Sequence, residues 1–195
     1  MAQLMLPCDE QTVRGLNVGD FLALSGRIIT GRDAAHHWLL ERHQDSVAPF
    51  LADSVIYHCG PVVRTDAEGR HTFVAAGPTT SAREEPYQAD VIGRYRLRGV
   101  IGKGGMGAKT LTGLQQYGAV YLHAVGGTAQ VLARAVVEVE KVFMLEEFGV
   151  PEALWVIRVE DFPVVVTMDS HGRSLHAEVE KDSRLRLQAI LGLPA

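Results

Sequence analysis

The sequence predicts a single domain of mixed α/β class. Its 195 residues are 47% hydrophobic, a length and composition that suit one domain with a substantial core. In the middle of the chain, strand-like runs alternate with helix-like segments, as in parallel strands connected by helices. Toward both ends, strand-like runs follow one another across short turns, which favours antiparallel pairing. We therefore expect one domain over residues 1–195 that combines both kinds of pairing.

The first half of the chain has the pattern of strands around one helix. Residues 18–29, VGDFLALSGRII, predict a strand or hairpin that ends at a Thr-Gly turn. Residues 32–43, RDAAHHWLLERH, have the composition and apolar spacing of a helix. Residues 55–63 (VIYHCGPVV) and 71–77 (HTFVAAG) predict two further strands, and the polar turn between them predicts a hairpin.

The second half of the chain alternates between strand and helix signals. Its expected elements, in order, are an amphipathic segment at 88–97, a strand at 98–101, a helix at 108–117, a strand at 119–125 and a charged helix at 180–191. Residues 128–149 mix helix and strand signals. Residues 153–172 contain two strand-like runs, one on each side of an Asp-Phe-Pro sequence.

The charge distribution argues against nucleic acid and for a small anionic ligand. The net charge is -4, whereas a nucleic-acid-binding domain normally carries a basic surplus. Residues 91–137 contain no Asp or Glu but do contain six cations, namely Arg94, Arg96, Arg98, Lys103, Lys109 and Arg134. These cations would suit a small anion if they lined one wall. The alternative is that several of them are solvated surface residues.

The chain lacks the apolar segments of secreted or membrane proteins. Its first residues, MAQLMLPCDEQ, have no basic start followed by a long apolar run. No uncharged apolar stretch of about 18 residues occurs elsewhere. We expect a soluble protein of the cytoplasm, without a membrane partner.

A glycine-rich loop follows the strand expected at 98–101. Gly102, Gly104 and Gly107 match the G-x-G-x-x-G pattern of dinucleotide sites. Such a site also needs a carboxylate about 20 residues further on to bind the ribose, and none lies there. The phosphate-loop pattern fails as well, because Ala108 stands where that pattern requires the glycine before its lysine.

The loop retains one feature that suits an anion, the lysine of Gly102-Lys103-Gly104-Gly105. At the start of a helix, backbone N–H groups and one ammonium group can together meet a carboxylate. A tight strand-to-helix turn with an exposed lysine explains the same spacing equally well.

A second polar loop, GPTTSAR at residues 77–83, lies between a strand and a helical segment. Its threonines and serine are good helix-capping residues, so capping alone accounts for one of them. Arg83 adds a planar guanidinium that can grip a carboxylate through two parallel hydrogen bonds. The loop therefore favours the binding of an acid.

With these motifs in order, the sequence resembles the β-type region of iron-sulfur hydro-lyases, which comprise class I fumarases and L-tartrate dehydratases. The segments that carry the resemblance are SGRIITGRDAAH (25–36), GPTTSAR (77–83), GVIGKGGM (99–106), HAVGGTA (123–129) and WVIRVEDFPVVVTMDSHG (155–172). They span nearly the whole chain. The resemblance implies a swivelling β/β/α domain and the reversible dehydration of a 2-hydroxy dicarboxylic acid.

The resemblance also implies which residues serve that reaction. Arg32, Arg83 and Lys103 match the positions at which the family binds substrate carboxylates, and Lys103 is also taken as catalytic. Thr79 matches the proposed base, although a hydroxyl is a poor base unless neighbouring charges activate it. Without the resemblance, Arg32 would be read as a helix-start residue paired with Asp33 or another acid.

The family's cofactor is a 4Fe-4S cluster, whose iron acts as a Lewis acid on the departing hydroxyl. A cubane cluster needs about three or four cysteine ligands, and this chain has only Cys8 and Cys59. The resemblance therefore implies that a partner α subunit carries the cluster, in an α2β2 assembly with the active site between the chains. Cys59 is expected to be a buried apolar residue. The chain alone is expected to be inactive.

The sequence departs from the family directly after the second polar loop. Glu84 and Glu85 follow GPTTSAR, where the family commonly has methionine, and would weaken attraction of an acid unless they face solvent.

The exact substrate and two alternative functions stay open. Fumarate is the expected substrate, then L-tartrate, with a mesaconate-type acid also open. A noncatalytic module that binds small anions and has lost its partner is the first alternative function, and a dinucleotide oxidoreductase the second.

Overall fold

The computed structural model describes residues 1–41 and 44–192, and within them one main sheet contains seven strands in the order β1-β2-β3-β6-β7-β9-β8. The strands are β1 (Ala2–Leu6), β2 (Phe21–Thr30), β3 (Val55–Tyr57), β6 (Gly99–Gly102), β7 (Val120–His123), β8 (Val136–Phe143) and β9 (Leu154–Met168). The pairs from β1 through β7 are parallel, whereas β9 runs antiparallel to β2, β7 and β8. The mixed α/β class is confirmed.

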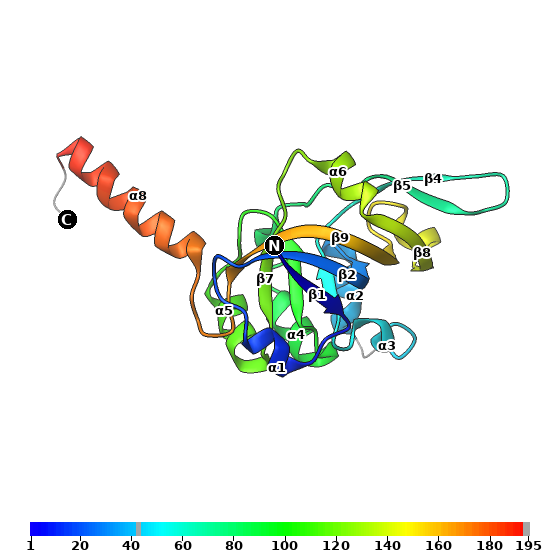
Figure 1. Cartoon of the computed structure of the whole chain (residues 1–195), viewed down its shortest axis with the longest axis horizontal. Coiled ribbons are helices and arrows are strands. Elements are labelled where there is room, and N and C mark those ends of the chain that lie inside the picture. Colours follow the sequence, from blue (N-terminus) through cyan, green and yellow to red (C-terminus); the bar gives the residue numbers. More distant parts are fainter. Residues whose placement is uncertain (42–43, 193–195) are drawn as a thin grey trace.

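The sheet closes on itself because β9 pairs with strands from both sides (Figure 1). Leu22 of β2 lies opposite Val164, and Tyr121 of β7 lies opposite Met168. Strands β2, β3, β6, β7 and β9 thus form a ring. One apolar cluster, which includes the fully buried Trp155, collects side chains from all five strands of this ring.

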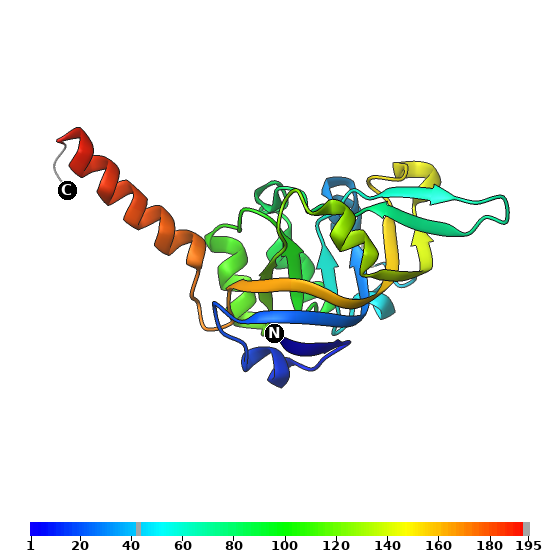
Figure 2. The same ribbon diagram turned by 45° about the horizontal axis from the view of Figure 1, so that its top comes forward.

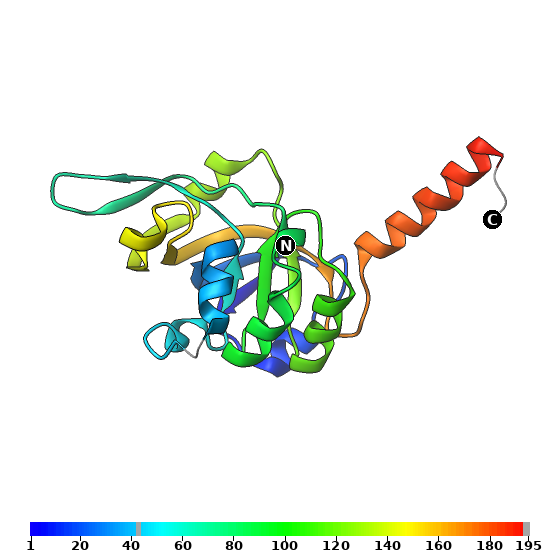
Figure 3. The ribbon, with the colours of Figure 1, turned by 180° about the vertical axis from the view of Figure 1, so that it is seen from behind.

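Helices cover the outer face of the parallel strands. Figure 3 shows α2 (Asp33–Glu41), α4 (Gln88–Tyr95) and α5 (Ala108–Tyr117) side by side over the sheet. With the short α3 (Ala48–Leu51), they bury a second apolar cluster against β3 and β6. Each of these helices connects two strands, so the loops at both ends of the parallel strands are held firmly in place.

Several smaller elements lie outside this frame. The hairpin of β4 (Val62–Thr65) and β5 (His71–Ala75) extends from one end of the molecule, with α6 (Ala129–Arg134) packed on it, and α8 (Leu175–Leu191) extends from the other (Figure 2). Helices α1 (Glu10–Arg14) and α7 (Leu145–Phe148) are short connections. Across the described residues, no helix is both long and apolar enough to cross a bilayer.

The predicted elements are found in most places, with two corrections in the strands. The helix at 108–117 is confirmed with these bounds. The strand expected at 55–63 is two strands, because Cys59 turns to pair with Pro78, and only β4 forms the hairpin. The two runs expected in 153–172 form the single strand β9, which continues through Asp161 by adopting a positive φ of 52° there.

The remaining differences lie at element ends. The helix expected at 32–43 ends at Glu41, and residues 42–43 lie outside the described part of the chain. The mixed segment 128–149 resolves into α6, β8 and α7. The last helix begins five residues earlier than its charged core suggested, because the Ser174 side chain caps it by accepting a hydrogen bond from Ala177 N. β1 and α1 were not predicted from the sequence.

Candidate active site

The predicted site residues lie where parallel strands end. Strands β2, β3, β6 and β7 run in the same direction, so their carboxyl ends share one edge, the usual place for ligands in α/β sheets. Arg32 follows β2 and Lys103 follows β6 directly. The loop at 77–83 reaches the same edge from the hairpin.

Backbone hydrogen bonds place Thr79 directly beside Lys103. Thr79 N donates to His58 O at 2.7 Å, just beyond the end of β3, and Lys103 N donates to Thr79 O at 3.3 Å. Ser81 N then donates to Lys103 O at 3.1 Å. The GPTTSAR loop is thereby inserted between the ends of β3 and β6, which brings together two residues that are distant in sequence.

Arg32 packs against the same strand end from the other side. Its side chain lies on Gly60, where an added Cβ would come within 2.6 Å of Arg32 Nη1, so glycine leaves the space that the guanidinium fills. Nη1 bonds to Glu152 Oε1 at 3.2 Å, and the other oxygen of Glu152 accepts from Ala34 N at the start of α2. The partner of Arg32 is therefore Glu152 and not its neighbour Asp33.

Among the predicted site residues, two buried polar atoms have no hydrogen-bond partner in the described part of the chain, namely Nε of Arg32 and Oγ1 of Thr79. A buried donor or acceptor without a partner costs roughly 1–3 kcal/mol, so such atoms are expected to meet a ligand, water or partner chain. Both belong to residues that the sequence analysis selected for substrate binding.

Lys103 adds a cation without a carboxylate partner in the described chain. Its side chain passes close to Gly126 in the turn after β7, where an added Cβ would stand 3.5 Å from Lys103 Cδ. No ion pair of Lys103 is found within residues 1–41 and 44–192. Its ammonium group thus differs from that of Lys109, which bonds to Asp90 Oδ2 at 2.8 Å.

Among the predicted site residues, Arg83 has the weakest case for substrate binding. It ends a short 3₁₀ helix over Ser81–Arg83, its side chain is 57% exposed, and it forms an ion pair with Asp33. Asp33 is the next residue after Arg32, so Arg83 lies at the rim of the same edge. A substrate carboxylate would have to compete with Asp33 for this guanidinium.

The glycine loop serves close packing as well as ligand access. An added Cβ at Gly102 would collide with the Ser81 side chain, and at Gly105 with the ring of His176. Gly104 and Gly105 also adopt positive φ angles of 84° and 76°, which favour glycine.

The helix start after this loop is already occupied by a carboxylate of the chain itself. Glu85 accepts from Gly107 N at 2.7 Å, from Thr110 N at 3.2 Å and from Thr110 Oγ1 at 2.7 Å. Two of the N–H groups that were candidates for binding an anion at the start of α5 are therefore occupied by Glu85. Glu85 instead stabilises the amino end of α5, where negative charge is favourable.

Glu84 is buried. The sequence had suggested that this residue must face solvent if the site binds an acid. It is 1% exposed, and its Oε2 lies 3.9 Å from His58 Nδ1 without a hydrogen-bond partner in the described residues. Burial, followed by the charge of Asp33, raises the pKa of Glu84 to about 7. With a pKa of about 7, Glu84 is partly protonated at neutral pH, which weakens its repulsion of an acid.

A buried polar network under the site was missed by sequence reasoning. His58 Nδ1 lies 2.8 Å from Ser81 Oγ, and Nε2 of His58 and His36 lie 2.7 and 2.9 Å from Gln88 Oε1. The Tyr121 hydroxyl donates to Ser81 Oγ at 2.8 Å. Burial lowers the pKa of both histidines. The sequence offered no signal for this network, because its five members come from five separate segments of the chain.

His123 lies next to the site, at the end of β7. It pairs with Gly102 across β7 and β6, and its buried Nδ1 has no partner within the described chain. The His176 ring lies 6.1 Å from the His123 ring, centre to centre. Burial lowers the pKa of both rings.

The other cations of 91–137 do not form a wall with Lys103. Arg98 bonds to Asp53 at 3.0 Å and Arg96 bonds to the same residue at 3.1 Å, at the amino end of β6. Lys103 lies at the carboxyl end of that strand. The expectation of one positive wall is therefore wrong, and the site depends on fewer cations.

The two cysteines do not fit an iron-sulfur cluster. Cys59 is fully buried, as expected, and burial raises its pKa to about 12 and that of Cys8 to about 11. Cluster ligands are thiolates, which a raised pKa disfavours. In the described residues no three His, Cys, Asp or Glu side chains are grouped so that they could hold a metal ion.

Comparison with known proteins shows the family to which the chain belongs. Residues 2–179 match the family model described as the fumarase C-terminus. The chain is 52% identical over 185 residues to a Geobacillus stearothermophilus protein assigned as a fumarate hydratase class I, covering 94% of this chain but 35% of that protein.

Two shorter relatives are covered almost completely. A Methanocaldococcus jannaschii protein assigned as an L(+)-tartrate dehydratase subunit beta is 40% identical over 187 residues, which are 94% of this chain and 95% of that protein. The L(+)-tartrate dehydratase subunit beta of Escherichia coli K12 is 37% identical over 180 residues, 91% of this chain and 88% of that subunit. From the family match and these relatives together, the chain belongs to the fumarase C-terminus family.

Proposed function

We propose that this chain is the β-type part of a hydro-lyase that reversibly removes water from a C4 2-hydroxy dicarboxylic acid. The observation that carries the proposal is the meeting of Arg32, Thr79 and Lys103 at one strand edge, with two buried polar atoms unpartnered in the described chain and an unpaired ammonium group. The hydro-lyase names of the relatives support the reaction class. Conversion between fumarate and L-malate is the first candidate reaction, and L-tartrate to oxaloacetate the second.

The proposed roles follow from the chemistry of each side chain. Arg32 and Lys103 bind and orient the substrate carboxylates, and Arg83 assists at the rim once it releases Asp33. Thr79 Oγ1 is the candidate base for the proton on the carbon adjacent to the leaving hydroxyl. A hydroxyl needs activation for this role, and the two neighbouring cations favour its deprotonated form.

The proposal assigns the rest of the active site to an α-type partner. The beta-subunit names of two relatives imply such a partner for them, and the chain spans only about a third of the fumarate hydratase relative. Since the cysteines of this chain do not fit a cluster, the 4Fe-4S cluster belongs to the α-type part in this proposal. We further propose an α2β2 assembly in the cytoplasm, with residues 1–195 as a single swivelling β/β/α domain.

The test is anaerobic co-expression with an α-type hydro-lyase subunit from the same genome. Hydration of fumarate and dehydration of L-malate and L-tartrate are measured for the complex and for each chain alone. We expect activity only in the complex, on one of these acids. A cluster-loaded complex that is inactive on all three acids would contradict the proposed reaction and favour a noncatalytic module that binds anions.

A further inference from the structure

The last helix, α8, has no packing partner in the described chain. None of its residues Leu175–Leu191 is buried, and its contact with the body is confined to its start near β9. Figures 1 and 2 show it extending away from the rest of the molecule. Six large apolar side chains are nevertheless exposed on it, at Leu175, Val179, Leu185, Leu187, Ile190 and Leu191.

α8 gains little stability from packing within the described chain. Its 17 residues are slightly more than the roughly 12–15 at which an isolated helix becomes marginally stable in water, and most helix stability in proteins comes from packing of an apolar face. Exposed apolar side chains that gather on one side mark an interaction surface. A partner that covers this side would therefore stabilise α8.

Most of the exposed apolar side chains of α8 lie on one side of the helix, whereas Leu185 lies on the opposite side. With about 3.6 residues per turn, Val179, Ser183 and Leu187 follow one another on one side, and Ile190 continues on the same side. The small Ser183 lies at the middle of the stripe and allows a second helix to approach closely. These four residues are called the α8 stripe below.

The charges that flank the α8 stripe are complementary to a second copy of the same helix. Asp182 and Arg186 border it on one side, and Glu180 and Arg184 border it on the other. In each pair the acid lies nearer the start of the helix and the arginine nearer the end. When two copies run antiparallel about a two-fold axis at Ser183, each acid faces an arginine of the other copy on the same side.

The apolar residues match in the same arrangement. Val179 of one copy lies level with Leu187 of the other, and Ser183 meets Ser183 at the axis. Asp182 and Arg186 have no ion-pair partner in the structure over the described residues, so both remain available for this contact. Glu180 already bonds to Arg184 at 2.6 Å within its own helix, and would share that pair with the second copy.

We propose that α8 is a self-association surface, through which two copies of this chain pair as antiparallel helices centred on Ser183. The pairing is independent of the proposed reaction. The proposed partner is a second copy of this chain, because the order of charges along α8 is complementary to itself. A partner of unrelated sequence would not require that order.

The test exchanges charges on the full chain and measures its mass across concentrations by sedimentation equilibrium. In a dimer of Arg186→Glu, the introduced glutamate faces Asp182 of the other copy at two symmetry-related positions. In a dimer of Asp182→Arg, the introduced arginine faces Arg186 of the other copy at the same two positions. We expect each single variant to raise the dimer dissociation constant at least about tenfold, since like charges across an interface are repulsive. The double variant Asp182→Arg/Arg186→Glu restores the wild-type value to within about threefold, and the two single variants, when mixed, form a heterodimer.

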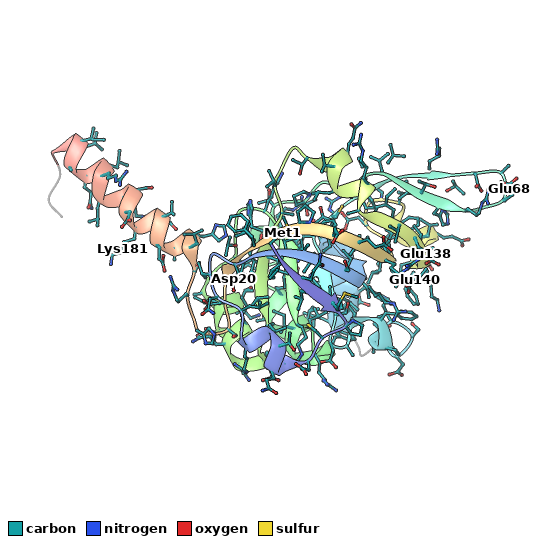
Figure 4. The ribbon with its side chains drawn as sticks, viewed as in Figure 1. Met1, Asp20, Glu68, Glu138, Glu140 and Lys181 are labelled. Carbon is teal, nitrogen blue, oxygen red and sulfur yellow. The ribbon has the colours of Figure 1, made fainter. Side chains whose placement is uncertain are left out.

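Lys181→Glu is the matched control, because it changes the charge of α8 as Arg186→Glu does. By the helical period, Lys181, which is labelled in Figure 4, lies on the side opposite the α8 stripe. It should leave the dissociation constant unchanged, and circular dichroism confirms that each variant keeps its helix content. A wild-type chain that stays monomeric at all concentrations would overturn the proposal. Dimers that persist unchanged in both single variants would overturn it as well.

Discussion

Glu84 is a carboxyl group whose protonation links the stability of the chain to pH. Its pKa is raised to about 7 by burial and by Asp33, whereas in an unfolded chain a glutamate titrates near 4.3. Between these values the folded protein holds a proton that the unfolded chain has released. The free energy of unfolding therefore falls as pH rises through this range.

We expect Glu84 to contribute a loss of roughly 2 kcal/mol between about pH 4 and pH 7. The buried histidines, whose pKa values are lowered, change the free energy of unfolding in the opposite direction, so the contribution of Glu84 is measured by urea unfolding as the difference between the wild-type chain and Glu84→Gln, whose amide does not titrate. Glu68→Gln, at the tip of the exposed hairpin (Figure 4), is the matched control and should keep the wild-type slope. Equal slopes in the two variants would show that Glu84 does not carry the effect.

Lys103 is the cation on which the proposed substrate site depends most. Lys103→Ala in the assembled enzyme should lower kcat/KM by roughly a hundredfold or more, as expected for loss of a charged group aimed at the reacting molecule. Lys109→Ala removes a lysine that is only six residues away but is bonded to Asp90. Its kinetic constants should stay near those of the wild type. Similar losses in both variants would remove Lys103 from the site.

The individual site residues show how far sequence reasoning reaches. Thr79 and Lys103 were predicted through the family resemblance, and the structure brings them together through backbone hydrogen bonds. The pairing of Arg83 with Asp33 and the burial of Glu84 were not predictable, because both depend on contacts between distant segments. A carboxylate next to a binding loop normally faces water, and only the tertiary structure shows that this one does not.

Among the elements, α5 owes its position to a side chain of another segment. Glu85 satisfies two backbone N–H groups at its start, so Glu85→Ala should lower the free energy of unfolding by about 1–2 kcal/mol. For a chain of this size the melting temperature should fall by about 2–8 °C. Glu147→Ala in α7 removes an exposed acid near a helix start and should change it by less than about 2 °C. A smaller loss for Glu85→Ala than for Glu147→Ala would contradict the capping role.

The elements that were predicted correctly carry their signals locally. The helix at 108–117 lies between Gly107 and Gly118, and Gly118 takes the left-handed conformation that ends helices. The strand β9 was expected as two runs because Asp161 interrupts its pattern. Pairing with β2 and β8 on its two sides keeps it continuous, and such pairing is not visible in a local window.

The whole molecule combines a closed sheet, a strand edge that carries the site, and two extensions, which are the β4–β5 hairpin and the helix α8. Ring closure by β9 holds the ends of β2, β3 and β6 at fixed spacing, which is what allows residues from three loops to converge. The mixed α/β class followed from the alternation of elements, but closure did not, because it depends on pairing between β2 and the distant β9. Nor did the sequence patterns suggest that α8 stands free of the body.

The central claim is that Arg32, Thr79 and Lys103 form this chain's part of a site completed by an α-type partner. It is tested most directly by a crystal structure of the cluster-loaded complex with a bound C4 dicarboxylate. We predict a substrate carboxylate within hydrogen-bond distance of Arg32 Nε and Lys103 Nζ, with Thr79 Oγ1 directed at the carbon that loses its proton. A dicarboxylate bound elsewhere, with these three side chains left in solvent, would contradict the claim.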